Sequence, residues 1–238
     1  MVTDKKCNYP SPAGKEFVLT GARFAGVNPS SNVLCLGCAF GESVCDLASE
    51  FRCKISAFDS DKLKVDTAQS LAIKKKVSHL ISFSSDFPSP SLEKGTFELA
   101  FLEGDTLADD NSANLLHTVS DLLLPRGWLA FSAPVQLQGS DPKKIASFEK
   151  TFRCKLKKEE DYRALANACG FNTHFVGLVP QSGWDNYCIH LANHLEDTRG
   201  YYADTTVKLN SHQQIDAFYR LEAFRYIGSL FCVARKRS

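Results

Sequence analysis

Short apolar runs alternate with segments of helical periodicity along most of the chain. The apolar runs predict strands at Val33–Gly37, Lys54–Phe58, His79–Phe83, Phe97–Leu102, Trp128–Ala133, Thr173–Val179 and Tyr226–Ala234. Apolar residues at helical spacing predict helices at Ala13–Ala25, Gly41–Phe51, Lys62–Lys76, Ala113–Leu124 and Glu159–Cys169. Pro125-Arg126-Gly127 is expected to end the fourth of these helices before the next strand. The pattern is therefore strand and helix in alternation.

This alternation predicts an α/β fold in which a mostly parallel, doubly wound sheet of seven strands carries helices on both faces. The central strands are apolar throughout, which is typical of strands buried on both sides. Residues Gln181 to Arg225 separate the last two strands and read as helical rather than as a tight hairpin. An insertion of this length is usually a functional cover or an interface.

Composition and charge argue against several classes of protein. The chain has 238 residues, a hydrophobic fraction of 44% and a formal net charge of +1, so no overall field attracts nucleic acid or an anionic membrane. No apolar run is long enough for a membrane helix, and the first residues lack the pattern of a signal peptide. The nine cysteines are odd in number and spread along the chain, and several lie in apolar segments, which favours buried thiols in a reducing cytoplasm over a disulfide framework.

The strongest local feature is the turn after the first strand, Gly37-Cys38-Ala39-Phe40-Gly41. Small residues at 37, 39 and 41 let the backbone approach a ligand closely, and the following helix N-terminus favours polar or anionic groups. A dinucleotide-binding fingerprint would need its third glycine at position 42, which is glutamate. The spacing therefore argues against a nicotinamide cofactor.

Acidic residues follow three of the other strands. Asp59, followed by Ser60, ends the second strand, where a carboxylate can accept hydrogen bonds from both hydroxyls of a ribose. Its alternative role is a helix N-cap, but Asp61 is an equally good cap. Asp86 and Phe87 follow the third strand and could receive an adenine, or Asp86 could form an Asx-turn before the next proline.

Glu103 ends the fourth strand, nearest to a reacting atom in such a crevice. It could orient a substrate or take its proton, or it could lie in an ordinary surface turn. His117 is a weaker candidate base. The cysteines at 35 and 38 form a C-x-x-C pair, but no second pair stands at zinc-finger spacing, so no metal site is expected.

In order and spacing, these motifs resemble those of the class I S-adenosylmethionine-dependent methyltransferases from Val33 to about Ser132. The glycine-rich turn resembles the family's first motif, Asp59 its ribose-binding acid and Asp86 its adenine-contacting acid. Leu124 to Leu129 resembles the turn that leads into the family's fifth strand. A bacterial subgroup of small-molecule methyltransferases is also similar in Leu19-Thr20-Gly21, in Glu103-Gly104 and around Gly183-Trp184.

The resemblance implies S-adenosylmethionine as cofactor and a small-molecule methyl acceptor as partner. It implies a single domain over 1–238: an N-terminal arm and helix (1–30), a cofactor-binding core (31–180), a helical insertion or cap (181–225), and a last strand with a basic tail (226–238). The expected cofactor-binding residues are Cys35, Gly37, Cys38, Ala39, Gly41, Asp59, Ser60, Asp86, Phe87 and Glu103. No nucleic-acid or membrane partner is expected, and a homodimer is left open.

Two positions depart from the family pattern. Cys35 stands where the family has an acid that serves the ligand's amino group, and Ala39 stands where it has glycine. These departures motivate a first alternative, a non-catalytic domain that binds S-adenosylmethionine or S-adenosylhomocysteine, and the second alternative is an NAD(P)-dependent oxidoreductase. In the insertion, Trp184 and Tyr187 either line the acceptor pocket or pack within the cap.

Overall fold

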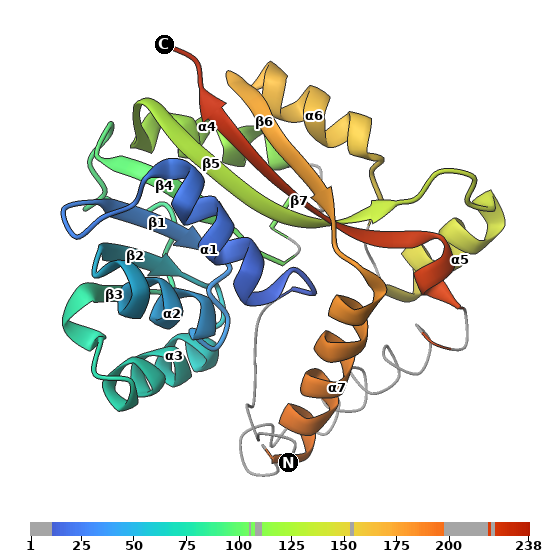
Figure 1. Cartoon of the computed structure of the whole chain (residues 1–238), viewed down its shortest axis with the longest axis horizontal. Coiled ribbons are helices and arrows are strands. Elements are labelled where there is room, and N and C mark those ends of the chain that lie inside the picture. The colour runs from blue at the N-terminus through green and yellow to red at the C-terminus, as the bar shows by residue number, and fades with distance from the viewer. Residues whose placement is uncertain (1–10, 105, 108–110, 153–154, 198–218, 220–221) are drawn as a thin grey trace.

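A computed structural model of the chain describes residues 11–104, 106–107, 111–152, 155–197, 219 and 222–238. Seven strands form one sheet in the order β3-β2-β1-β4-β5-β7-β6 (Figure 1). Their bounds are β1 Asn32–Leu36, β2 Lys54–Phe58, β3 Ile81–Ser84, β4 Phe97–Leu102, β5 Leu123–Gln136, β6 Phe171–Leu178 and β7 Ile227–Lys236. The first five strands pair in parallel, whereas β7 is antiparallel to both β5 and β6. The predicted mostly parallel, seven-stranded α/β fold is confirmed.

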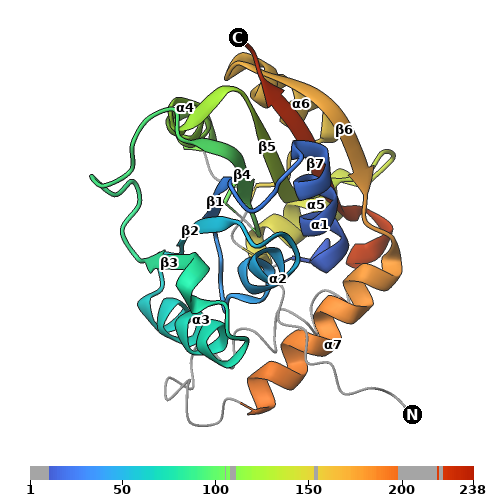
Figure 2. The ribbon, with the colours of Figure 1, turned by 60° about the vertical axis from the view of Figure 1, so that its left-hand side comes forward.

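Helices cover both faces of this sheet (Figures 1 and 2). The face of α1, α2 and α3 is opposite to the face of α4 and α6. The helical bounds are α1 Gly14–Ala25, α2 Glu42–Phe51, α3 Lys62–Lys74, η1 Ser78–Leu80, α4 Ser112–Leu122, α5 Pro142–Phe152, α6 Glu159–Ala168, α7 Gln181–Asp197 and η2 Ala223–Arg225. Helices α5 and α7 lie beyond one end of the sheet (Figure 1).

The core has one layer on each side of the sheet because strand side chains alternate between faces. Val33 and Cys35 of β1 pack into the layer that α1 and α2 cover. Leu34 and Leu36 pack into the layer that α4 and α6 cover. The same alternation along β4 divides Leu99 and Phe101 from Ala100 and Leu102. Both faces are buried, as the continuous apolar strands predict.

The largest boundary difference from the sequence prediction lies at the junction of α4 and β5. The helix expected to run to Leu124 ends at Leu122, and β5 begins at Leu123 rather than at Trp128. The predicted Pro-Arg-Gly stop therefore lies inside β5, where the register with β4 shifts between Phe97 and Leu99. Arg126 takes a positive φ of 62° at this irregularity, so an irregular stretch of β5 contains the residues that were expected to form a turn. Helix α5 was not predicted.

The predicted insertion between β6 and β7 begins with α7, and its residues 198–218, 220 and 221 lie outside the described part of the chain. In the structure as described, none of the helices combines the length and the apolar character that crossing a membrane requires. The described cysteines are buried free thiols, at 35, 38, 45, 53, 169, 188 and 232.

Candidate active site

The turn between β1 and α2 is bonded to the end of β2. Backbone N–H groups of Gly37 and Cys38 both donate to the carbonyl oxygen of Phe58, at 2.9 and 3.1 Å. Gly37, Ala39 and Gly41 all take positive φ values, of 77°, 44° and 87°. For an alanine this conformation costs about 1–2 kcal/mol. Ala39 therefore carries backbone strain in the folded chain.

Different neighbours exclude a side chain at each of the two glycines of this turn. A Cβ atom on Gly37 would lie 2.7 Å from the carbonyl oxygen of Glu103 and 3.0 Å from Cγ2 of Thr106. A Cβ atom on Gly41 would lie 2.7 Å from Cβ of Ala68, on α3. Gly37 thus allows β4 to approach the turn, while Gly41 allows α3 to pack against the start of α2.

Asp59 faces the turn. Its Oδ2 accepts a hydrogen bond from the backbone N–H of Ala39 at 2.9 Å, and its Oδ1 accepts one from the N–H of Asp61 at 3.0 Å. The side chain of Asp61 caps α3 by accepting from the N–H groups of Leu63 and Lys64. The capping role therefore belongs to Asp61, and each Asp59 oxygen keeps a lone pair for another donor. Ser60 beside it is exposed.

The end of β3 is tied to the same edge, since the N–H of Asp59 donates to the carbonyl oxygen of Ser84 at 3.3 Å. Asp86 is exposed, and its backbone N–H donates to the Ser84 hydroxyl, so the local turn is made by serine rather than by an aspartate side chain. The ring of Phe87 packs edge-on against Phe58 at 5.3 Å between centroids. The structure thus brings Phe87 to the end of β2, near Asp59.

Glu103 is buried, with 2% of its surface exposed. Its Oε2 accepts a hydrogen bond from the Ser43 hydroxyl on α2 at 2.8 Å, and its Oε1 accepts one from the Cys35 thiol at 3.7 Å. Burial raises its pKa from 4.5 to about 7, although both hydrogen bonds oppose that shift. The carboxyl group therefore lies beneath the glycine-rich turn and not in a surface turn.

Two side chains of this region were not predicted. Ser43 is fully buried in the first turn of α2, where it donates to Glu103. Thr106 lies against Gly37, and its Oγ1 is buried without a hydrogen-bond partner among the described residues. Strand alternation could have indicated the contact between Ser43 and Glu103. It places position 103 on the same face of the sheet as Leu99 and Phe101, and α2, which carries Ser43, covers that face. No sequence pattern marks Thr106.

Trp184 and Tyr187 of α7 contact each other edge-on, with centroids 6.4 Å apart. Trp184 is 9% exposed and belongs to a third apolar cluster with Ile145 and Phe148 of α5 and Ile227 of β7. Tyr187 packs against the edge of that cluster. The start of α7 also adjoins the segment before α1, since a Cβ atom on Gly183 would lie 2.9 Å from the carbonyl oxygen of Pro12.

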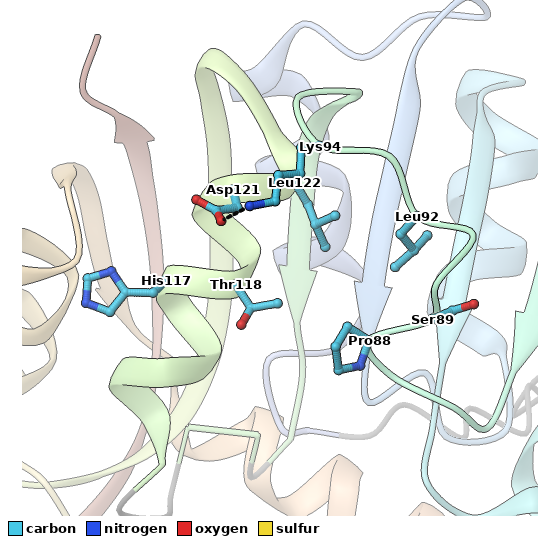
Figure 3. Close-up of a pocket in the computed structure, with 8 residues that line it drawn as sticks. All are labelled: Pro88, Ser89, Leu92, Lys94, His117, Thr118, Asp121 and Leu122. Atoms are coloured by element: carbon cyan, nitrogen blue, oxygen red, sulfur yellow. Dashed lines mark hydrogen bonds and ion pairs between the residues drawn. The ribbon is translucent and has the colours of Figure 1, made fainter.

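A separate surface pocket of about 380 Å³ lies between α4 and the loop that follows β3 (Figure 3). Pro88, Ser89 and Leu92 line it from the loop, and His117, Thr118 and Leu122 line it from α4. An ion pair of 2.7 Å between Lys94 and Asp121 closes one side. None of the predicted cofactor residues lines this pocket. The described residues contain no group of three or more histidine, cysteine or acidic side chains placed to hold a metal ion.

No protein-family model matches the chain, and no curated protein is similar to it in sequence. Solved structures do share its fold. A methyltransferase from Thiobacillus denitrificans in complex with S-adenosyl-L-homocysteine superposes with a TM-score of 0.76 at 16% identity, covering 97% of this chain and 94% of its own. The geranyl diphosphate C-methyltransferase of Streptomyces coelicolor gives a TM-score of 0.66 at 13% identity, covering 93% of this chain and 78% of its own.

The fold is also shared by a protein named for another reaction. The [4+2]-cyclase SpnF superposes with a TM-score of 0.77 at 17% identity, covering 94% of this chain and 81% of its own. The chain therefore has the fold of the class I S-adenosylmethionine-dependent methyltransferases. Because one fold hosts several reactions, its activity has to be argued from the site.

Proposed function

We propose that the chain binds S-adenosylmethionine at the carboxyl ends of β1, β2 and β4 and transfers its methyl group to a small-molecule acceptor in the cytoplasm. The observation that carries this proposal is the bond between the Asp59 carboxylate and the N–H of Ala39 at 2.9 Å. It joins a backbone turn of small residues to an acid that can accept ribose hydroxyls. The methyltransferases with this fold support the choice of cofactor.

The residues at this edge fit an adenosine that carries a charged amino-acid part. Asp59 has lone pairs left for two hydroxyl donors. Thr106 Oγ1 is buried beside Gly37 with no partner among the described residues, which is the state expected of a group that a ligand satisfies. Phe87 offers an apolar neighbour for an adenine ring, and Asp86 an acceptor for its amino group.

The bound cofactor would supply a methyl group already activated by its positive sulfur. The protein then has to hold the acceptor in line with that methyl and exclude water, and such alignment can contribute roughly 7–11 kcal/mol toward the barrier. Asp59 and the backbone of the turn would hold the cofactor. We place the acceptor on the side of α7, where Tyr187 is the less buried member of the aromatic pair and Trp184 anchors the helix.

A ligand screen by thermal unfolding tests the cofactor. A ligand present at a hundred times its dissociation constant adds about 2.7 kcal/mol to the free energy of unfolding. We expect stabilisation by S-adenosylmethionine and S-adenosylhomocysteine and none by NAD or NADP. Stabilisation by a nicotinamide cofactor alone would overturn the proposal. Against that outcome, Glu42 places a carboxylate at the first position of α2, where a dinucleotide would bring its pyrophosphate, and pairs with Lys75 at 2.6 Å.

A second candidate is a domain that binds S-adenosylmethionine or S-adenosylhomocysteine without catalysis. The positive φ of Ala39 and the thiol of Cys35 in place of an acid favour it, because both would weaken cofactor binding. Turnover separates the two candidates. We expect methyl transfer from labelled S-adenosylmethionine to at least one member of a panel of amines, phenols, thiols and carboxylic acids. Tight binding with no turnover on any of them would favour the non-catalytic candidate.

A further inference from the structure

The side chain of Glu103 points from the end of β4 toward β1. Alternation along β4 puts position 103 on the face of Phe101, and Phe101 pairs directly with Cys35 on β1. The backbone N–H of Glu103 donates to the carbonyl oxygen of Leu36 at 3.0 Å, which holds the two strand ends together. The carboxyl group therefore lies next to the Cys35 thiol, 3.7 Å from Oε1 to Sγ.

Within the described part of the chain, this carboxyl group has hydrogen-bond donors but no counter-charge. Ser43 and Cys35 are both neutral donors, and among the described residues no lysine, arginine or histidine contributes to its electrostatics. A buried carboxylate without a cation is costly, and proteins usually pair such a group. A positively charged ligand group at this position would remove that cost.

The other charged or titratable groups that the structure describes around the turn do not neutralise Glu103. Burial raises the pKa values of the Cys35 and Cys38 thiols, so both are uncharged near neutral pH. Asp59 adds a second negative charge that acts on both thiols. Lys64 of α3 acts on Cys38 but does not pair with Glu103. The surroundings of the turn are thus acidic overall, which favours a cationic ligand.

We infer that Glu103 is the counter-charge for the α-ammonium group of S-adenosylmethionine, and that it replaces from β4 the acid that β1 lacks at Cys35. The inference rests on the proposed function and names the residue that binds one end of its cofactor. The Glu103 carboxylate would lie directly beside the place of the family acid, because its Oε1 is in hydrogen-bond contact with the Cys35 thiol that replaces that acid. Glu103 is on this view a binding residue rather than a base for the acceptor.

The proposed role of Glu103 makes the affinity for the cofactor depend on pH. Burial raises the pKa of Glu103 to about 7, so in the free protein the group is only partly ionised near neutrality. A bound ammonium favours the carboxylate, so binding releases a proton and affinity rises with pH until Glu103 is ionised in the free protein. The Ser43 hydroxyl lowers this pKa by donating to the carboxylate. Its removal should move the dependence to higher pH.

Calorimetry with three ligands tests the inference on the full chain. S-adenosylmethionine and S-adenosylhomocysteine both carry the α-ammonium, whereas methylthioadenosine lacks the whole amino-acid part. We expect Glu103→Gln to weaken the first two ligands by a similar factor, roughly tenfold or more, and to leave methylthioadenosine within about twofold. Equal loss for all three ligands would show a structural effect and overturn the inference. A loss confined to S-adenosylmethionine would overturn it too, because the sulfonium would then be the partner.

The most specific control moves the negative charge from Glu103 on β4 back to position 35 on β1. In the double variant Cys35→Asp with Glu103→Gln, the acid returns to β1, and we expect most of the lost affinity for S-adenosylhomocysteine to be regained. Failure of this folded double variant to regain affinity would count against the inference. Ser43→Ala keeps the Glu103 carboxylate and the ligand's ammonium group, and it removes one hydrogen bond to the carboxylate. It should retain affinity at high pH and lose it as the pH falls, at a higher midpoint than the parent.

Different results would overturn the proposed function and the proposed role of Glu103. If the parent binds none of the three ligands, the proposed function and the inference fail together. If the parent binds them with an affinity that Glu103→Gln does not change and that is flat between about pH 6 and pH 8, the function stands and the inference fails. Proton release is read from the dependence of the binding heat on the ionisation enthalpy of the buffer. No proton release at a pH near 7 would likewise overturn the inference.

Discussion

The Asp59 carboxylate at the end of β2 accepts the backbone N–H of Ala39 at 2.9 Å, across the turn that joins β1 to α2. The bond links a residue that would hold the ribose to the residue whose backbone is strained. Ligand affinity and the conformation of the turn are therefore coupled through one carboxylate. The effects of substitutions at Asp59 and at Ala39 can be compared directly.

Asp59→Ala should weaken S-adenosylmethionine by about 2–3 kcal/mol, the usual cost of losing a hydrogen bond to a charged group. Calorimetry measures the change. Asp66→Ala is a matched control, because that aspartate lies on the adjacent helix in an exposed ion pair with Lys62. An affinity for Asp59→Ala equal to that of the parent would remove Asp59 from the cofactor site.

Ala39→Gly should stabilise the protein by about 1 kcal/mol, because glycine takes a positive φ without the steric cost that alanine carries. Ala164→Gly is the opposite control. Ala164 is exposed within α6, where glycine costs about 1 kcal/mol relative to alanine. Denaturant unfolding of the two variants should give shifts of opposite sign, and a loss of stability in both would contradict the strain at position 39.

Glu103 should make the protein less stable as the pH rises from about 4.5 to about 7. Its pKa in the folded protein is about 7, against 4.5 in the unfolded chain, so the native state binds more protons in this window. The difference amounts to a few kcal/mol, on the order of 3, once both states are ionised. Glu103→Gln should flatten this slope and raise the free energy of unfolding above pH 7. A slope that persists unchanged in the variant would assign it to other groups.

Trp184→Ala should lower the free energy of unfolding by about 3–5 kcal/mol, because the ring is buried among Ile145, Phe148 and Ile227. Tyr187→Ala should cost less, since that ring is only partly buried. Once a substrate is known, Tyr187→Ala should raise KM for the acceptor more than it changes KM for the cofactor. A loss of acceptor binding without a loss of stability in Trp184→Ala would assign Trp184 to the pocket instead.

The sequence was informative where one local pattern decides the structure. The strand, small-residue turn and helix from Val33 to Phe51 needed only periodicity and glycine, and Asp61 as the cap of α3 needed only its place before the helix. The start of β5 could not be predicted, because Pro125 and Gly127 are ordinary loop residues that here lie inside a strand, at an irregularity in its pairing with β4.

The direction of side chains depends on the packing of distant elements. Glu103 was recognised as the residue that ends β4, but its contact with Cys35 depends on the register of β4 against β1. Helix α5 was not predicted because its buried residues, Ile145 and Phe148, are too few to give a clear helical periodicity. Their burial depends on α7 and β7, which lie far away along the chain.

The position of β7 has a consequence for the order in which the sheet can be completed. It lies between β5 and β6, and β6 is an edge strand whose ladder partner is β7. During synthesis β6 is made before β7, so it has no neighbour to bond until residues 227–236 have also been made. Until then β5 also exposes an open edge, which is the kind of surface that pairs with other chains. A nascent chain that stalls between β6 and β7 should therefore depend on chaperones more than one that stalls after β7.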